Sequence, residues 1–159
     1  MGIDTEVMLK GFVSADDITK FLSKKYSNVN NNVNKNSYQS ICDLRKDYDK
    51  FIVKDGSDVC NVISGFITFT DTVTGERRML HYFYDNIRYT DELQETINKI
   101  DVENKAEFIG NCVMYEVKLS LCYCDRSVAI MKEILEEFGG WIDENDCDNV
   151  GYKYIEKKV

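Results

Sequence analysis

The sequence lacks several residue types and patterns that would mark a particular activity. Among its 159 residues there is no proline and only one histidine, and no run of 18 apolar residues occurs, so we expect no membrane-spanning helix. The Walker phosphate-binding pattern, the glycine-rich dinucleotide-binding pattern and the His-Glu-x-x-His zinc pattern are all absent. These absences exclude the enzyme classes that those patterns define.

The sequence shows no recognisable targeting-signal pattern and no regular disulfide framework, so we expect neither. The first six residues contain neither the basic nor the apolar segment of a secretory signal, and Glu6 stands where a myristoylation motif needs Ser or Thr. The six cysteines are irregularly spaced, and Cys122 and Cys124 alone are too few ligands for a zinc site. We therefore predict reduced cysteines, no metal or other cofactor, and a cytoplasmic location.

The chain is acidic, with 28 Asp and Glu against 20 Lys and Arg, which gives a net charge of −8. This charge argues against direct binding to nucleic acid or to an anionic membrane surface, because both repel carboxylates. The hydrophobic fraction of 43% is sufficient for one buried core, so we predict a single α+β domain over residues 1–159. The bias toward residues with AT-rich codons fits a phage, a virus or another AT-rich source.

Hydrophobic periodicity predicts the secondary structure. Apolar residues at every second position predict strands, and apolar residues at helical spacing predict helices. The predicted strands cover 6–13, 59–70, 77–85 and 112–124; the predicted helices cover 15–26 and 126–138, with a further helix beginning at Thr90. The remaining predictions are a flexible asparagine-rich loop at 27–37, a short helix and strand within 38–56, and a hairpin within 141–155.

These elements predict an α+β fold, in which two or three helices pack on one face of a mainly antiparallel sheet. Each predicted strand has one continuous apolar row, which needs a covering layer, and the longest strand has a clearly polar second row. A strand followed by a helix occurs near both ends of the chain. This repetition favours a split β-α-β arrangement that is ferredoxin-like in the broad sense.

No catalytic residue can be assigned from the sequence. His81 is the only histidine, and it lies between Leu80 and Tyr82 on a predicted strand. A histidine base would need an orienting acid and a nucleophile, and the sequence places neither beside it. We therefore interpret His81 as a structural side chain of the sheet.

The most distinctive local feature is an acidic stretch between residues 133 and 152. It holds seven carboxylates and no Lys or Arg, whereas the rest of the chain is nearly balanced, with 21 acids and 20 bases. Such a stretch is either a solvated surface that favours solubility or a patch that binds a basic partner. The candidate partner-binding residues are Glu133, Glu136, Glu137, Asp143, Glu144, Asp146 and Asp148.

These observations favour a small acidic interaction protein that binds a basic protein surface. In its most specific form, the hypothesis is a viral or phage inhibitor that mimics the charge of nucleic acid. One alternative is a small ligand-binding or enzymatic α+β domain with a pocket of aromatic and carboxylate side chains. Another is a structural subunit that forms homo-oligomers through its sheet edges. A salt-sensitive complex with a basic protein, a deep aromatic pocket and concentration-dependent assembly would distinguish the three.

Overall fold

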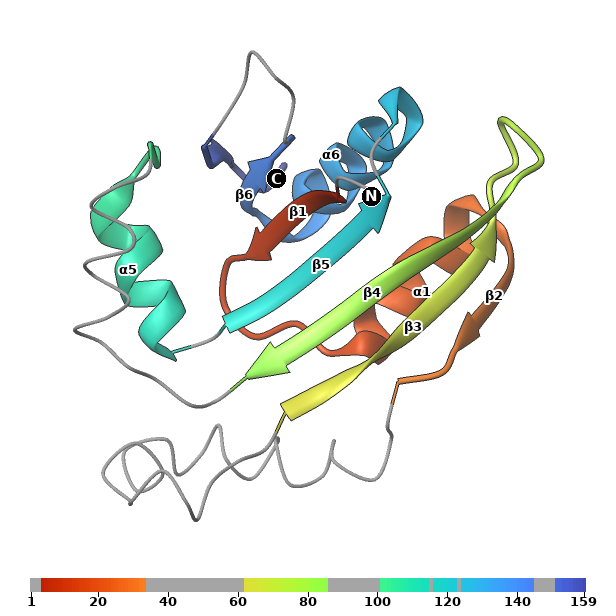
Figure 1. Ribbon diagram of the computed structural model, residues 1–159, viewed down its shortest axis with the longest axis horizontal. Coiled ribbons are helices and arrows are strands. Elements are labelled where there is room, and N and C mark those ends of the chain that lie inside the picture. The colour runs from red at the N-terminus through yellow and green to blue at the C-terminus, as the bar shows by residue number, and fades with distance from the viewer. Residues whose placement is uncertain (1–3, 34–61, 86–100, 115, 123, 145–150) are drawn as a thin grey trace.

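The computed structural model describes residues 4–33, 62–85, 101–114, 116–122, 124–144 and 151–159. This part of the chain forms three helices and seven strands, and Figure 1 shows how they are arranged. In chain order the elements are β1 (Asp4–Leu9), α1 (Ala15–Lys25), β2 (Ser27–Asn31), β3 (Val62–Thr70), β4 (Arg77–Asp85), α5 (Lys105–Met114), β5 (Glu116–Cys122), α6 (Asp125–Phe138), β6 (Gly140–Asp143) and β7 (Lys153–Ile155). Within these ranges, no helix combines the length and hydropathy needed to cross a bilayer.

The strands form one sheet in the order β2-β3-β4-β5-β1-β6-β7, and every neighbouring pair is antiparallel. This confirms the predicted α+β class. Because β5 and β6 lie on either side of β1 and α6 joins them, this part of the sheet is one split β-α-β unit. The sheet has seven strands, whereas the ferredoxin-like pattern β-α-β-β-α-β has four, so the likeness extends only to the broad class.

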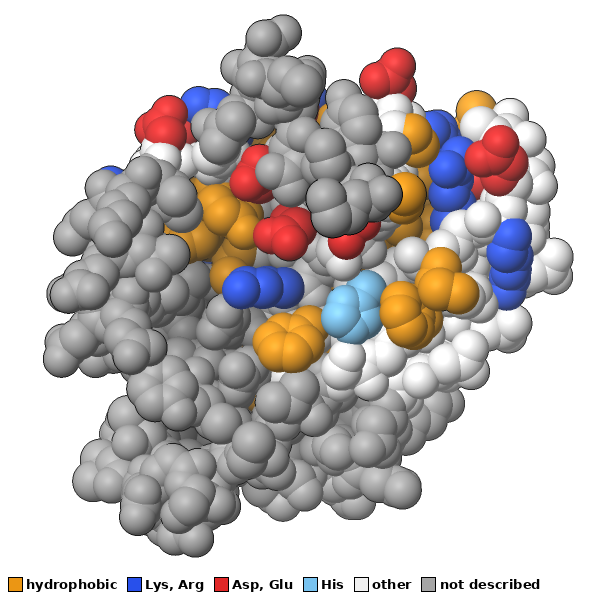
Figure 2. All heavy atoms as spheres, in the orientation of Figure 1, with side chains coloured by type: hydrophobic (Ala, Val, Ile, Leu, Met, Phe, Trp, Pro, Cys, Tyr) orange, Lys and Arg blue, Asp and Glu red, His pale blue; other side chains and the backbone are white. Residues whose placement is uncertain are grey.

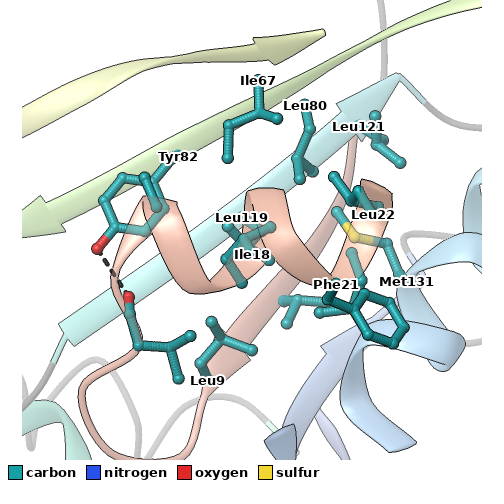
Figure 3. Close-up of a cluster of buried hydrophobic side chains, with 14 of the residues drawn as sticks. Leu9, Ile18, Phe21, Leu22, Ile67, Leu80, Tyr82, Leu119, Leu121 and Met131 are labelled. Carbon is teal, nitrogen blue, oxygen red and sulfur yellow. Dashed lines mark hydrogen bonds between the residues drawn. The ribbon is translucent and has the colours of Figure 1, made fainter. Parts of the chain in front are cut away.

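The main core lies between the sheet and two helices, α1 and α6. The strands turn one apolar row toward these helices, including Leu80 and Tyr82 of β4 and Leu119 of β5, all of which are buried. Figure 3 shows Ile18 of α1 and Met131 of α6 pointing into the same cluster. The predicted helices over 15–26 and 126–138 are therefore confirmed, as is their packing on one side of the sheet.

Local sequence signals explain where these helices begin and end. The side chain of Ser14 accepts a hydrogen bond of 3.1 Å from the backbone N–H of Asp17, which satisfies a free donor of the first turn of α1. Helix α6 starts after Cys124, whose side chain accepts from the backbone N–H of Ser127 as its N-cap. Gly139 ends α6 with a φ of 79°, a conformation that favours glycine.

A second, smaller core lies on the opposite side of the sheet. There Phe108 of α5 packs edge-on against Trp141, with ring centroids 5.2 Å apart, and Met8 of β1 belongs to the same cluster. The prediction of a strand over 112–124 is wrong for residues 112–114, which are the last turn of α5. The apolar alternation of β5 runs back into the helix, so periodicity alone could not separate them.

The predicted loop at 27–37 is wrong for residues 27–31, which form β2 and pair with β3. Although this segment is rich in asparagine, Val29 packs against the main core and Val33, just beyond the strand, is buried in it. Asn28 has a φ of 52° where the register shifts, a conformation that asparagine tolerates well. Residues 34–37, and the predictions for 38–56 and for a helix from Thr90, lie outside the described residues.

Gly65 of β3 lies where the chain just beyond β2 passes close to the sheet. A Cβ atom at Gly65 would lie 2.7 Å from the Cα atom of Val33 and 2.8 Å from the carbonyl oxygen of Asn32. Because backbone cannot move aside cheaply, we expect Gly65→Ala to lower the free energy of unfolding by about 2 kcal/mol. Urea denaturation followed by circular dichroism measures this change.

The matched control is Gly110→Ala, because Gly110 lies in α5 and a Cβ there meets nothing within 4 Å. This variant should raise the free energy of unfolding by up to about 1 kcal/mol through better helix propensity. Equal effects of the two substitutions would contradict the close contact between residues 32–33 and β3.

Candidate functional site

The structure places the three glutamates of α6 in different surroundings. Glu133 accepts a hydrogen bond of 2.6 Å from the hydroxyl of Tyr26, and the ammonium group of Lys25 lies 4.0 Å from it. Glu136 forms an ion pair of 3.0 Å with Lys158, whereas Glu137 is exposed. Two of the three are thus paired within the molecule, which reduces the negative charge that a partner would meet.

The remaining predicted acids do not continue the row along α6. Glu144 forms an ion pair of 3.0 Å with Lys132. Asp143 directly follows Ile142 in β6, and the side chain of Ile142 lies in the main core. Because side chains alternate along a strand, Asp143 points to the side of the sheet opposite α1 and α6. Asp146 and Asp148 lie outside the described residues. The five described carboxylates are therefore distributed over two faces of the molecule, and their role in binding stays a prediction.

A second candidate surface is the side of the sheet that faces away from α1 and α6. Here α5 covers only the part around β1 and β6, through the cluster of Met8, Phe108 and Trp141. We call the remaining part over β3, β4 and β5 the open face. Its described side chains are Ser64, Phe66, Thr68, Thr70, Arg77, Met79, His81, Phe83, Lys118, Ser120 and Cys122.

Aromatic and apolar side chains occupy the centre of the open face. The rings of Phe66 and His81 lie 5.0 Å apart, and those of His81 and Phe83 lie 6.3 Å apart. Phe66 is 43% exposed and Met79 is 58% exposed, which is unusual for large apolar residues. Figure 2 shows the histidine between hydrophobic side chains, with a basic side chain and a group of carboxylates nearby.

His81 forms a hydrogen bond of 2.8 Å between its Nε2 atom and the hydroxyl of Ser64. In nucleophilic catalysis by a Ser–His pair, a third group, most often an acid, orients the histidine, and hydrogen-bond donors stabilise the oxyanion. The neighbour of His81 on β5 is Ser120, so the strand pairing brings no acid beside the imidazole. The geometry therefore supports the interpretation of His81 as a sheet side chain.

Three carboxylates adjoin the open face on the strands beyond β5. Glu6 is paired across the sheet with Ser120 on one side and with Asp143 on the other, and Asp4 lies two residues before Glu6 on the same face. The hydroxyl of Tyr152 donates a hydrogen bond of 3.1 Å to Glu6 and helps to orient its carboxylate. Sequence analysis found Asp143 but missed Asp4 and Glu6, because only the strand order brings β1 beside β6.

The described residues also contain a buried charged network at the β3–β4 hairpin. Asp71 is fully buried, and the guanidinium of Arg126 donates to both of its carboxylate oxygens at 2.8 and 3.1 Å. Arg78 lies 3.4 Å from the same carboxylate. The hydrogen bonds from Arg126 hold the pKa of Asp71 at about 2, although burial acts in the opposite direction. This network joins the hairpin turn to the first turn of α6.

Glu133 belongs to the outer part of this network. Arg126 donates a hydrogen bond of 3.1 Å to the hydroxyl of Tyr26, which in turn donates to Glu133. Burial and the nearby Glu133 carboxylate raise the pKa of Tyr26, so that the hydroxyl keeps its proton. Glu133 is therefore a structural residue in this arrangement, whatever it contributes to binding.

Cys124 lies beside the network at the start of α6. Its sulfur is 3.6 Å from the guanidinium of Arg78 and 3.2 Å from the hydroxyl of Ser127. Burial by itself would raise the pKa of the Cys124 thiol, but the hydrogen bonds from Ser127 and the charge of Arg78 outweigh it and lower the pKa. Cys122 is exposed on the open side of the sheet, and both cysteines are free thiols.

Other surface features of the described part do not assemble a recognisable reaction centre. No cluster of three His, Cys, Asp or Glu side chains there is arranged to hold a metal ion. One cleft of about 440 Å³ is lined by Lys10, Tyr154 and Lys157, among others, and another of about 430 Å³ contains the Lys132–Glu144 pair. Neither cleft includes His81 or the aromatic side chains of the open face.

Comparisons with known proteins do not assign the chain to a class. No protein-family model matches it, and neither the curated proteins nor the solved structures contain a significant match. Function must therefore be inferred from the side chains themselves.

The buried network gives a stability prediction. Replacing Asp71 with Asn should lower the free energy of unfolding by about 3 kcal/mol, because Arg126 and Arg78 lose a charged partner in a mostly buried position. The control Asp125→Asn removes an exposed carboxylate one residue from Arg126 and should cost less than about 1 kcal/mol. Urea denaturation at neutral pH measures both changes.

The same substitution should alter the pH dependence of stability. The pKa of Asp71 is lowered from 3.8 to about 2 by folding, so its stabilising effect is complete above about pH 4 and is lost as the pH falls toward 2. The stabilities of the wild-type protein and the Asp71→Asn variant should therefore converge in this range. A difference that stays constant from neutral pH to pH 2 would contradict this assignment.

Proposed function

We propose that this chain is a non-catalytic interaction protein that binds a basic protein partner. The observation that carries the proposal is the combination of a net charge of −8 with large apolar side chains exposed on a part of the sheet that none of the described helices covers. A contiguous patch of exposed apolar side chains marks an interaction surface, and a strong net charge favours partners of opposite sign. In the specific form of the proposal, the basic surface of the partner also binds nucleic acid, so that this chain and nucleic acid compete for the same surface.

The distribution of charge supports binding more than it supports close mimicry of a phosphate row. Pairing with Lys25, Lys132 and Lys158 reduces the field of three predicted acids. The overall excess of carboxylates remains, and it attracts a basic protein at distances up to the Debye length, about 8 Å at physiological ionic strength. We therefore expect the acids to act mainly on the association rate.

The sheet edges give less support to assembly of identical subunits. At β7, the backbone N–H of Tyr154 donates to the side chain of Glu103 at 3.1 Å, and the backbone N–H of Glu103 donates to the carbonyl of Tyr152 at 3.0 Å. At β2, the pairing with β3 contains an irregularity, and Arg77 donates to the carbonyl of Asn28. Occupied or irregular edges are a common protection against edge-to-edge pairing.

An affinity experiment tests the proposed function. The purified chain is immobilised, exposed to a cell extract and washed with increasing salt. We expect the retained proteins to be basic and to elute as salt rises, because the Debye length falls from about 10 Å at 0.1 M to about 3 Å at 1 M. Retention of acidic proteins, or retention that molar salt does not weaken, would contradict the proposal.

Charge variants then test the retained partner after purification. Replacing Glu136 and Glu137 with Gln and Asp143 and Asp146 with Asn should slow association several-fold and leave the fold intact. The opposite control replaces the exposed Lys20 and Lys24 with Gln and should speed association. Association rates that stay equal across these variants would show that the acidic stretch is only a solvated surface.

A further inference from the structure

We infer that the open face, together with the adjoining carboxylates of β1 and β6, is the docking surface, and that it binds an extended segment of the partner that is apolar at one end and basic at the other. The inference rests on the proposed function and names the surface that performs it. On this side of the sheet, residues on five neighbouring strands form one row that changes from apolar to acidic. The row is defined by strand register and does not depend on the ion pairs of α6.

The row crosses five strands. Cross-strand pairing places Phe66 opposite His81, His81 opposite Ser120, Ser120 opposite Glu6, and Glu6 opposite Asp143. Exposed apolar and aromatic groups therefore stand at one end, a small hydroxyl in the middle, and carboxylates at the other end. Four strand spacings separate Phe66 from Asp143, which is about 19 Å.

The apolar end provides a surface suited to a protein side chain. Phe66 and Met79 are about half exposed, and the rings of His81 and Phe83 extend the same surface. Aromatic residues and methionine are enriched at protein interfaces, where their large apolar area contributes most of the binding energy. A partner residue such as Trp or Leu placed over Phe66 would remove this area from water.

The acidic end provides the complementary charge. Glu6 and Asp143 face each other across β1 and β6, and Asp4 lies about 7 Å from Glu6 along the same face. Opposite charges on neighbouring positions of a sheet face attract, so a Lys or Arg of a partner placed near this pair would be attracted by both carboxylates. The two ends together therefore select a partner by both hydrophobicity and charge.

These charges favour a protein segment over the other occupants of an aromatic sheet face. Bases of single-stranded nucleic acid stack on exposed aromatic rings, but its phosphates would meet Asp4, Glu6 and Asp143 on a chain of charge −8. A second copy of the chain carries the same charge and would bring the same carboxylates to the contact. An extended segment rises about 3.3 Å per residue, so roughly six residues would span the row.

The test uses a defined peptide and measures dissociation. The probe has Trp at one end and Lys at the other, separated by a Gly-Ser spacer of about four residues. One control peptide has Glu in place of Lys, and another has Ser in place of Trp. Binding to the immobilised full-length chain is followed by biolayer interferometry at low salt.

Paired variants of the protein locate the contact. Phe66→Ser with Met79→Ser should raise the dissociation rate of the Trp–Lys peptide by roughly tenfold, and Glu6→Gln with Asp143→Asn should raise it several-fold. The control for the first pair is Val73→Ser, which removes a 72% exposed apolar side chain from the β3–β4 turn. The control for the second is Asp17→Asn with Asp125→Asn, which removes two exposed carboxylates from the first turns of α1 and α6. A further variant, Glu136→Gln with Glu137→Gln on α6, tests the acidic stretch as the alternative contact. Neither control should change the dissociation rate.

The outcomes separate this inference from the proposed function. If the peptide binds in a charge-selective way but only the α6 variant speeds its dissociation, the inferred surface is wrong and the proposed function stands. If the Glu peptide binds as well as the Lys peptide, both fail. Absence of binding by the Trp–Lys peptide, tighter binding of a single-stranded oligonucleotide, or a salt-strengthened dimer in sedimentation would each overturn the inferred occupant.

Discussion

The burial of one apolar row per strand under α1 and α6 is the constraint on which the rest of the structure depends. Because side chains alternate along a strand, placing Leu80, Tyr82 and Leu119 in the core forces Met79, His81 and Lys118 to the opposite face. Helix α5 covers only the part of that face near Trp141. The exposed aromatic surface is therefore a direct consequence of how the core is built and of how little of the second face the described helices cover.

At one end of the sheet, the buried carboxylate of Asp71 adds a charged contact between the sheet and the helix layer. Its hydrogen bonds to Arg126 fix the β3–β4 turn against the start of α6, and the extension through Tyr26 reaches Glu133. A residue that the charge pattern marks as a binding residue thus has an evident structural role. The same network places the guanidinium of Arg78 beside Cys124, which contributes to the lowered pKa of that thiol.

Much of the local structure could be predicted from the sequence, because its signals are local. The strand over 77–85 and the end of α6 at Gly139 follow from alternation, periodicity and a glycine signal. In contrast, Val29 and Val33 form too short a pattern to reveal that β2 joins the sheet. Alternation also continues through residues 112–114, so the end of α5 left no separate signal. The candidate site was only partly predictable for a related reason. The acidic stretch is visible in the sequence, but its lysine partners depend on tertiary packing and the neighbours of Glu6 depend on strand order.

The central claim is that the open face meets a basic, partly apolar partner, and methionine methyl NMR tests it most directly. Met79 reports on the open face, Met131 on the main core and Met8 on the smaller core beneath α5. With the methionine methyl groups labelled with ¹³C, addition of the Trp–Lys peptide should shift the Met79 resonance and leave that of Met131 in place. A peptide that binds without moving the Met79 resonance would contradict the account.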